Sequence, residues 1–233
     1  RRVYDFIENM DPEGEPLLVS FDYDPQISAE CHPMAYAILR HALGRGVKIV
    51  AVAMHPAAPA LALDALETVA AETGAVYGED YCFMGYGAGF AFMMAKMAES
   101  FPESFPQDYY GTPIKEIPVA QSLENYDSFT MVLSLAGNKA PEYYIIYGQS
   151  KSGVLVSAGV TAVMAADYYP FYGSGQLTGL ISGLKGATEY EQLINRRDRA
   201  FVGMDAQSII HLLIVALIVL GNIAYFGTRK QRS

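Results

Sequence analysis

The fold is decided by the stretch Leu17-Leu-Val-Ser-Phe-Asp-Tyr-Asp-Pro25. Its first five residues are almost entirely apolar, which is typical of a strand buried on both faces of a parallel sheet. Two carboxylates and a proline then end the strand. A helix is expected to follow from about Ala29 to Leu43, where Gly44 stops it. The stretch therefore begins a strand–helix unit of the kind from which α/β domains are built.

The same alternation continues along the chain. Further strands are expected within 47–54, 80–84, 129–135 and 154–164, with helices at 59–73, after 89 and from 141 to 147. The proline-containing stretch 99–128 is too long for an ordinary connection, so it forms either a functional loop or an excursion across the domain. We therefore predict an α/β fold, a Rossmann-like three-layer domain over residues 1–200 with a mostly parallel sheet of about five strands.

The second dominant feature is the uncharged stretch from Ser208 to Phe226. At about 1.5 Å per residue it reaches about 28 Å, close to the thickness of the hydrocarbon core of a bilayer. A buried helix of a soluble core is the alternative, but such helices are usually shorter and carry a polar face. We predict a linker at 201–207, a transmembrane helix at 208–226 and a basic cytoplasmic tail at 227–233.

The tail decides the expected orientation. Arg229, Lys230 and Arg232 follow the apolar stretch, and positive residues favour the cytoplasmic side. The domain is therefore expected to be extracytoplasmic at the cell membrane. A second basic cluster precedes the helix and weakens this argument: Arg196, Arg197 and Arg199.

The rest of the chain is acidic and rich in tyrosine. All 25 acidic residues but only 13 of the 16 basic ones precede the apolar stretch, which gives the domain a net charge of −12. This charge argues against nucleic-acid binding and against adsorption on anionic lipid. Cys31 and Cys82 have no metal-binding or redox spacing. We expect two buried free thiols, with one disulfide as the alternative in an oxidising compartment.

Ligands of open parallel sheets bind beyond the carboxyl ends of the strands. The candidate ligand-binding residues are those expected at these ends: Asp22, Asp24, His55, Gly85, Tyr86, Gly87 and Tyr168. The Asp22-x-Asp24 pair resembles the aspartates of haloacid-dehalogenase-type phosphatases, but Pro25-Gln26 departs from their turn and no later acidic pair follows. Helix capping or turn hydrogen bonds are the alternative for both carboxylates.

The glycine-rich turn Gly85-x-Gly87-x-Gly89 stands where a phosphate could bind, between a strand and a helix. It departs from the dinucleotide fingerprint in spacing and in strand position, so close packing of helix and strand is the alternative. Asp22 with His55 is the best metal-binding pair, and it has no third partner. His32 and His41 are expected as capping or surface residues. We assign no catalytic residue, no metal site and no cofactor, since no nucleophile has an evident base.

Three glycines recur at every fourth residue in a helix predicted from Ser174 to Ile194: Gly175, Gly179 and Gly183. On one helix they would form a face without side chains. Each glycine destabilises a helix interior by about 0.5–1 kcal/mol relative to alanine, so we predict that another backbone packs closely there. The partner is either the domain's own sheet or another subunit, and we assign the three glycines to an interface.

Several phrases together resemble a family of uncharacterised prokaryotic membrane proteins. They are Val19-Ser-Phe-Asp-Tyr-Asp-Pro25, Tyr109-Tyr-Gly-Thr-Pro113, Gly159-Val-Thr-Ala-Val163, Tyr168-Tyr-Pro-Phe-Tyr172 with Ser174-Gly-Gln-Leu177, and Gly203-Met-Asp-Ala-Gln-Ser208. The resemblance implies one membrane helix before the domain and one after it. It implies no activity and no catalytic residues.

Two functions remain open from the sequence. The first is a membrane-anchored domain that acts by binding or assembly, as a subunit of a homo-oligomer or of a complex with other membrane proteins. Its partners would be the lipid bilayer and those subunits. The second is a small-ligand receptor, or a phosphate- or metal-dependent enzyme, that uses the strand-end pocket. The sequence leans against an enzyme because it offers no catalytic constellation.

Overall fold

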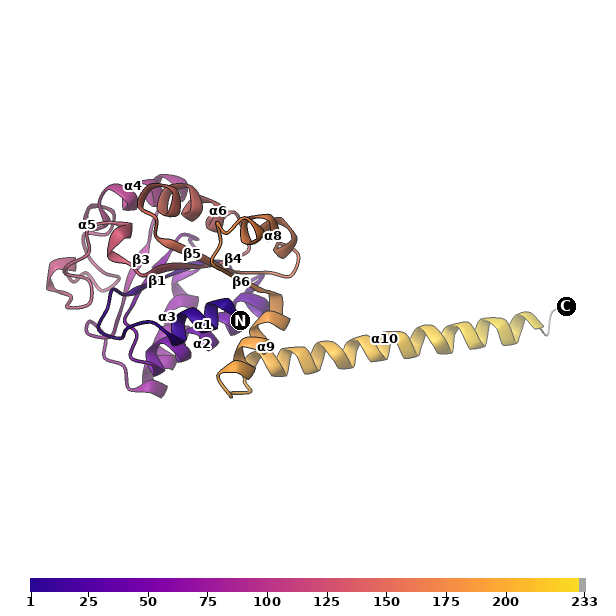
Figure 1. The fold of residues 1–233 in the computed structure, drawn as a ribbon. Coiled ribbons are helices and arrows are strands. Elements are labelled where there is room, and N and C mark those ends of the chain that lie inside the picture. The colour runs from indigo at the N-terminus through magenta and orange to yellow at the C-terminus, as the bar shows by residue number, and fades with distance from the viewer. Residues whose placement is uncertain (231–233) are drawn as a thin grey trace.

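The chain folds into an α/β domain from which one long helix projects (Figure 1). The structure, a computed structural model, describes residues 1–230, with side chains as far as Tyr225. The strands are β1 (Leu17–Asp22), β2 (Ile49–Ala53), β3 (Tyr81–Tyr86), β4 (Met131–Ala136), β5 (Leu155–Val160) and β6 (Gly179–Ser182). The main helices are α1 (Arg2–Glu8), α2 (Ser28–Gly44), α3 (Pro59–Thr73), α4 (Ala91–Glu99), α6 (Ala140–Tyr144), α8 (Ala165–Gly173), α9 (Gly183–Leu193) and α10 (Arg199–Lys230). Shorter turns are α5 (Phe101–Ser104), η1 (Ile114–Glu116), η2 (Tyr126–Ser128), η3 (Ile145–Gln149) and α7 (Ser150–Ser152).

The six strands form one parallel sheet in the order β3-β2-β1-β4-β5-β6. The predicted Rossmann-like α/β fold is confirmed, with one strand more than the predicted five. Strands β1 and β4 pair at the centre of the sheet, and the order along the chain reverses between them. In open α/β sheets, this switch point is where a crevice for ligands commonly forms.

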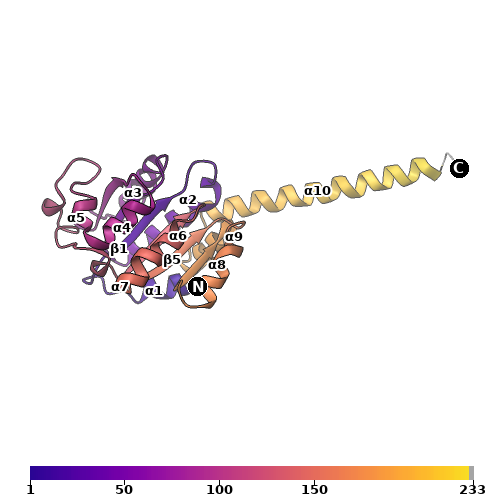
Figure 2. The same ribbon diagram turned by 90° about the horizontal axis from the view of Figure 1, so that it is seen from above.

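Helices cover both faces of the sheet (Figures 1 and 2). Helices α1, α2, α3 and α9 lie on one face, and α4, α6 and α8 lie on the other. Successive strand residues point to opposite faces. In β1, Val19 and Phe21 therefore pack in the first core and Leu18 packs in the second. Burial on both faces explains why the strands are continuous apolar runs in the sequence.

The long stretch between α4 and β4 is an excursion that covers the outer edge of β3. The Tyr109 amide donates to the Phe83 carbonyl over 2.8 Å, and the Val119 amide donates to the Gly78 carbonyl over 2.9 Å. An edge strand without such cover would present unpaired backbone groups to other chains. The excursion therefore has a structural role at this edge.

The prediction of one helix from Ser174 to Ile194 is wrong. Gly175 lies in the turn after α8 with a φ of +82°, Gly179 begins β6, and Gly183 begins α9 with a φ of +58°. Positive φ values interrupt a right-handed helix, so the fourfold spacing of these glycines does not give a common face. The spacing therefore gives no reason to assign these glycines to an interface.

Two of these glycines nevertheless permit close packing inside the domain. A Cβ atom on Gly179 would overlap the Val3 side chain of α1, and one on Gly183 would overlap Ala162 before α8. Nothing lies within 4 Å of a Cβ atom placed on Gly175. Of the two predicted partners, the domain itself therefore approaches Gly179 and Gly183.

Helix α10 is continuous from Arg199 to Lys230, so the predicted linker 201–207 is its first two turns. Within the described residues, α10 is the one helix long and apolar enough to cross a membrane, over Arg199–Tyr225, and its most apolar window has no buried residue. Figures 1 and 2 show it projecting away from the domain. Of the predicted tail, 231–233 lie outside the described residues.

Candidate functional site

The predicted site lies at the carboxyl edge of the sheet, where Asp22 ends β1. Asp22 is fully buried. The Ser20 hydroxyl donates to its Oδ1 over 2.6 Å, and the Ser134 hydroxyl donates to its Oδ2 over 2.5 Å. The Tyr144 hydroxyl in turn donates to Ser20 Oγ over 2.7 Å. The carboxyl group is thus enclosed in a hydrogen-bonded cluster at the switch point.

Burial also changes the ionisation of Asp22. Removing the carboxyl from water raises its pKa to about 7, against the opposing effect of the hydrogen bonds from Ser134 and Ser20. The cause is that a charged carboxylate loses its hydration on burial. Near neutral pH the group therefore exists in both protonation states.

The crevice above Asp22 is occupied by the protein itself. A Cβ atom on Gly137, just after β4, would overlap the Ile27 side chain from the start of α2. Next to it, the Asn138 side chain donates to the Asp22 carbonyl over 2.7 Å. The Tyr168 hydroxyl donates to the Asn138 carbonyl over 2.9 Å. Tyr168 is fully buried, so it holds α8 to the sheet.

Asp24 and His55 are the predicted residues that the structure brings together at the surface. Their Oδ2 and Nε2 atoms lie 4.0 Å apart, and both side chains are about one-third exposed. Asp24 Oδ1 accepts the Gln26 amide over 2.8 Å, and His55 Nδ1 accepts the Ala57 amide over 3.2 Å. Each side chain therefore closes its own turn, and only one atom of each faces the other.

The glycines of the Gly85–Gly89 turn are explained by packing. Gly85 has a φ of +87° at an irregularity in the pairing of β2 with β3, a β-bulge position that favours glycine. A Cβ atom on Gly87 would approach Met93 and Met54 within 3.0 Å. Tyr86 is 42 % exposed. Ligand binding at this turn remains a prediction.

The chemistry available at this edge is limited. Both thiols are buried and free, and burial raises the pKa of Cys31 to about 12 and the pKa of Cys82 further. Neither is a thiolate nucleophile at neutral pH. In the part of the chain that the structure describes, no group of three His, Cys, Asp or Glu residues could hold a metal ion. The Asp24–His55 pair can accept and donate hydrogen bonds, and it is the one predicted pair open to a ligand.

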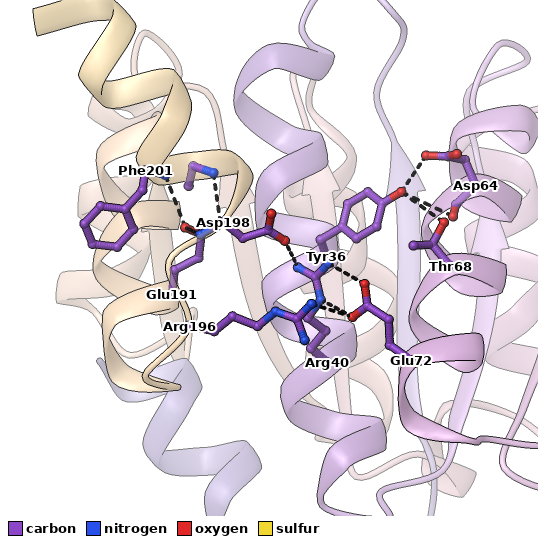
Figure 3. A network of polar contacts seen from close by, with 10 residues as sticks. Tyr36, Arg40, Asp64, Thr68, Glu72, Glu191, Arg196, Asp198 and Phe201 are labelled. Atoms are coloured by element: carbon purple, nitrogen blue, oxygen red, sulfur yellow. Dashed lines mark hydrogen bonds and ion pairs between the residues drawn. The ribbon is translucent and has the colours of Figure 1, made fainter.

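The most extensive polar network lies elsewhere, at the base of α10 (Figure 3). Glu191 of α9 is 1 % exposed, and its carboxylate accepts the backbone amides of Asp198, Ala200 and Phe201 over 2.9, 2.8 and 3.2 Å. These amides belong to the first turn of α10, where backbone donors have no partner within the helix. A carboxylate there also interacts favourably with the helix dipole. Glu191 therefore caps α10 from the preceding helix.

Ion pairs connect the same turn to α2 and α3. Arg40 binds Glu72 through two hydrogen bonds of 2.6 and 2.9 Å and pairs with Asp198. Arg196 adds a second ion pair to Glu72 at 3.0 Å. The guanidinium of Arg199 stacks on the Tyr36 ring at 3.9 Å. Because several charges share this geometry, the base of α10 is held more firmly than by an isolated surface ion pair.

Sequence reasoning missed this joint because its partners are far apart in the chain. In the sequence, Arg196, Arg197 and Arg199 indicate only a charge cluster near the membrane. Glu191 and Arg40 carry no sequence signal that distinguishes them from solvated helix residues. Ser20 and Ser134 did carry one, since each is the single hydroxyl residue in an apolar strand, and the two pair directly across β1 and β4.

An open groove of about 1030 Å³ lies between α10 and the domain. It is lined by α8, β6, α9, the first turns of α10 and residues at the starts of α1 and α2. Arg1, Glu30, Lys185 and Glu189 are its charged residues, and none of the predicted ligand-binding residues contributes to it. Its wall includes Tyr169, Tyr172, Leu184, Met204, Ile210 and His211. This groove joins the domain to the beginning of the apolar stretch.

No protein family, no curated protein and no solved structure matches this chain. Its function is therefore inferred from the geometry of the chain itself.

Proposed function

We propose that this chain is a membrane-anchored α/β domain that acts by binding and assembly, as a subunit of an oligomeric membrane complex. The observation that carries the proposal is α10. Its apolar window contains no residue buried by the domain. Apolar surface in water is unfavourable by about 25 cal/mol per Å², so a helix with this composition requires lipid or other helices around it.

The joint at the base of α10 supports a structural role for the anchor. A helix that only tethered a domain would need no fixed angle. Here the Glu191 cap and the Arg40–Asp198 pair hold α10 against α9 and α2. A fixed angle favours defined contacts with neighbouring subunits, because all copies in one membrane then present the same surface.

The paired arginines also support an extracytoplasmic domain. Arg196 lies against Glu72 and Arg199 lies on Tyr36, so acidic and aromatic groups of the domain engage these charges. The tail residues Arg229, Lys230 and Arg232 then determine the orientation by the positive-inside rule.

The test is the native mass of the full chain after extraction in a mild detergent. We expect a mass of two or more copies, or of a complex with other membrane proteins. A monomer without partners, across several detergents, would contradict the assembly role while leaving the anchor in place.

A ligand-binding function is the second candidate, and the exposed Asp24–His55 pair favours it. A thermal-shift screen of the full chain against phosphates, sugars and divalent cations tests this candidate. Stabilisation by one compound that disappears in Asp24→Asn would support a receptor or an enzyme at this edge.

A further inference from the structure

Helix α8 and the loop before it expose apolar side chains to their surroundings. Val163 is 86 % exposed and Tyr169 is 58 % exposed. Ala162, Ala166 and Pro170 are exposed as well. Asp167 is the only charged residue between 161 and 173. A helix on the surface of a soluble domain normally turns polar residues outward, so this exposed face has the opposite character.

This apolar face lies at the end of the domain from which α10 leaves. Both views place α8 and α9 on that side (Figures 1 and 2). The groove beside α10 relates the two helices more closely, because Tyr169 and Tyr172 line it together with Ile210 and His211. The exposed face of α8 is therefore level with the point on α10 where the uncharged stretch begins.

The opposite edge of the sheet has a different surface. There a groove of about 910 Å³ is lined largely by charged and polar residues, including Glu13, Glu15, Lys48, Glu79 and Asp80. The groove at the amino ends of the strands thus carries part of the charge of the domain. The apolar character of α8 is local to the side of α10 and is not a general property of the surface.

We propose that α8, with the loop 161–164, lies in the interfacial layer of the bilayer and forms a second contact between the domain and lipid. The inference rests on the proposed anchoring by α10. Tyrosine suits this layer because its ring is apolar and its hydroxyl is polar. Helices with an apolar face settle about 5–10 Å into the boundary between headgroups and acyl chains.

Lipid is the occupant that the surroundings of this face favour. The face is continuous, through the groove, with the helix that carries the apolar stretch. Anchoring by α10 holds α8 beside the bilayer, so even a weak affinity for lipid leads to contact. The acidic domain disfavours anionic lipid, so the contact is expected with zwitterionic phosphatidylcholine.

The sequence has no tryptophan, so a single introduced tryptophan reports on one position. The test places Val163→Trp, and separately Tyr169→Trp, in the full chain and reconstitutes it in phosphatidylcholine vesicles brominated on the acyl chains. Val76→Trp is the matched control, because Val76 is also an exposed valine in a loop but lies before β3 at the opposite edge. Ile214→Trp, in the middle of the apolar stretch, reports on the anchor.

We expect brominated lipid to quench Val163→Trp and Tyr169→Trp clearly more than Val76→Trp, because an interfacial helix lies at the boundary between headgroups and acyl chains. If Ile214→Trp is quenched and Val163→Trp behaves like Val76→Trp, the contact of α8 with lipid is refuted and the anchor stands. The lipid contact is refuted in the same way if Val163→Trp is protected from an aqueous quencher but not quenched by brominated lipid, since a second copy of the chain then covers it. If Ile214→Trp is not quenched either, the anchoring itself fails. Circular dichroism of each variant confirms that it is folded.

Discussion

At the scale of single residues, Asp22 is a fully buried carboxyl group that accepts two side-chain hydrogen bonds. It stands at the switch point of the sheet, where a ligand-binding carboxylate would be expected, but two serine hydroxyls enclose it. A buried carboxyl with satisfied hydrogen bonds can pin the relative register of two strands. Asp22 links β1 to β4 in this way, so its role is in the fold and its ionisation acts on stability.

The pKa of Asp22 predicts how stability depends on pH. An unfolded Asp has a pKa of about 3.9, whereas burial raises that of folded Asp22 to about 7. Between these values the folded state holds a proton that the unfolded state has lost. Stability therefore falls as pH rises through this range, by up to about 1.4 kcal/mol per pH unit, and the loss is complete above the folded pKa.

The isosteric variant Asp22→Asn removes this contribution. We expect the difference in melting temperature, variant minus wild type, to increase as the pH is raised from about 5 to about 8. Circular dichroism of the full chain in detergent measures both melting temperatures. Asp64 and Glu72 have lowered pKa values, so they make stability rise with pH. Both residues are present in the wild type and in the variant, so their contribution cancels in the difference between the two proteins. Equal pH profiles for the two proteins would disprove the protonation of buried Asp22.

At the scale of elements, the position of α10 depends on its cap. Glu191 satisfies three amides of the first turn from a separate helix. Glutamine in its place has one carbonyl oxygen and an amide group that cannot accept these bonds. Glu191→Gln should therefore destabilise the joint by about 2 kcal/mol, the range for hydrogen bonds to charged groups.

Hydrogen exchange of amides 198–201 and the melting temperature measure this effect in the full chain. Glu189→Gln is the matched control, two residues away on the same helix, where the side chain is exposed and pairs with Lys185. That change should alter stability by less than about 0.5 kcal/mol. Equal exchange rates in the two variants would mean that Glu191 does not cap α10.

Among the elements, the sequence predicts those whose burial leaves a recognisable pattern of apolar residues. The first five strands are apolar runs because both faces of the sheet are covered, and this pattern is visible without a structure. Strand β6 cannot be recognised in this way, since it has four residues and begins with Gly179. The residues on either side of β6 have a sequence pattern that is compatible with one continuous helix. The positive φ values of Gly175 and Gly183, which interrupt such a helix, leave no periodic signal in the sequence.

The candidate site was only partly predictable for a related reason. The strand ends were placed correctly, so Asp22, Asp24 and His55 do lie at one edge of the sheet. Whether such an edge is open depends on side chains from other elements, here Ile27 over Gly137. The contacts of Glu191 and Arg40 likewise join segments that only the folded chain brings together.

At the scale of the whole molecule, the charge and polarity of the surface change from one end to the other. Acidic residues such as Glu13, Glu15 and Glu79 line a groove at the amino ends of the strands, apolar side chains of α8 lie at the side of α10, and basic residues follow the apolar stretch. A molecule arranged in this order fits a membrane with its domain on one side and its tail on the other. A direct experiment tests on which side of the membrane the domain lies.

Cysteine labelling determines the orientation. Cys31 and Cys82 are buried and their raised pKa values keep them protonated, so a membrane-impermeant maleimide should not modify the native chain. Ser122→Cys places an exposed thiol on the domain, and Ser233→Cys places a thiol in the basic sequence that follows the apolar stretch. Because positive residues favour the cytoplasm, we expect Ser122→Cys to react in intact cells and Ser233→Cys to react only after permeabilisation. The reverse pattern would put the domain in the cytoplasm, and the arginines at 196–199 would then determine the orientation. Reaction of both thiols in sealed cells would mean that α10 does not cross the membrane, since a spanning helix separates its two ends.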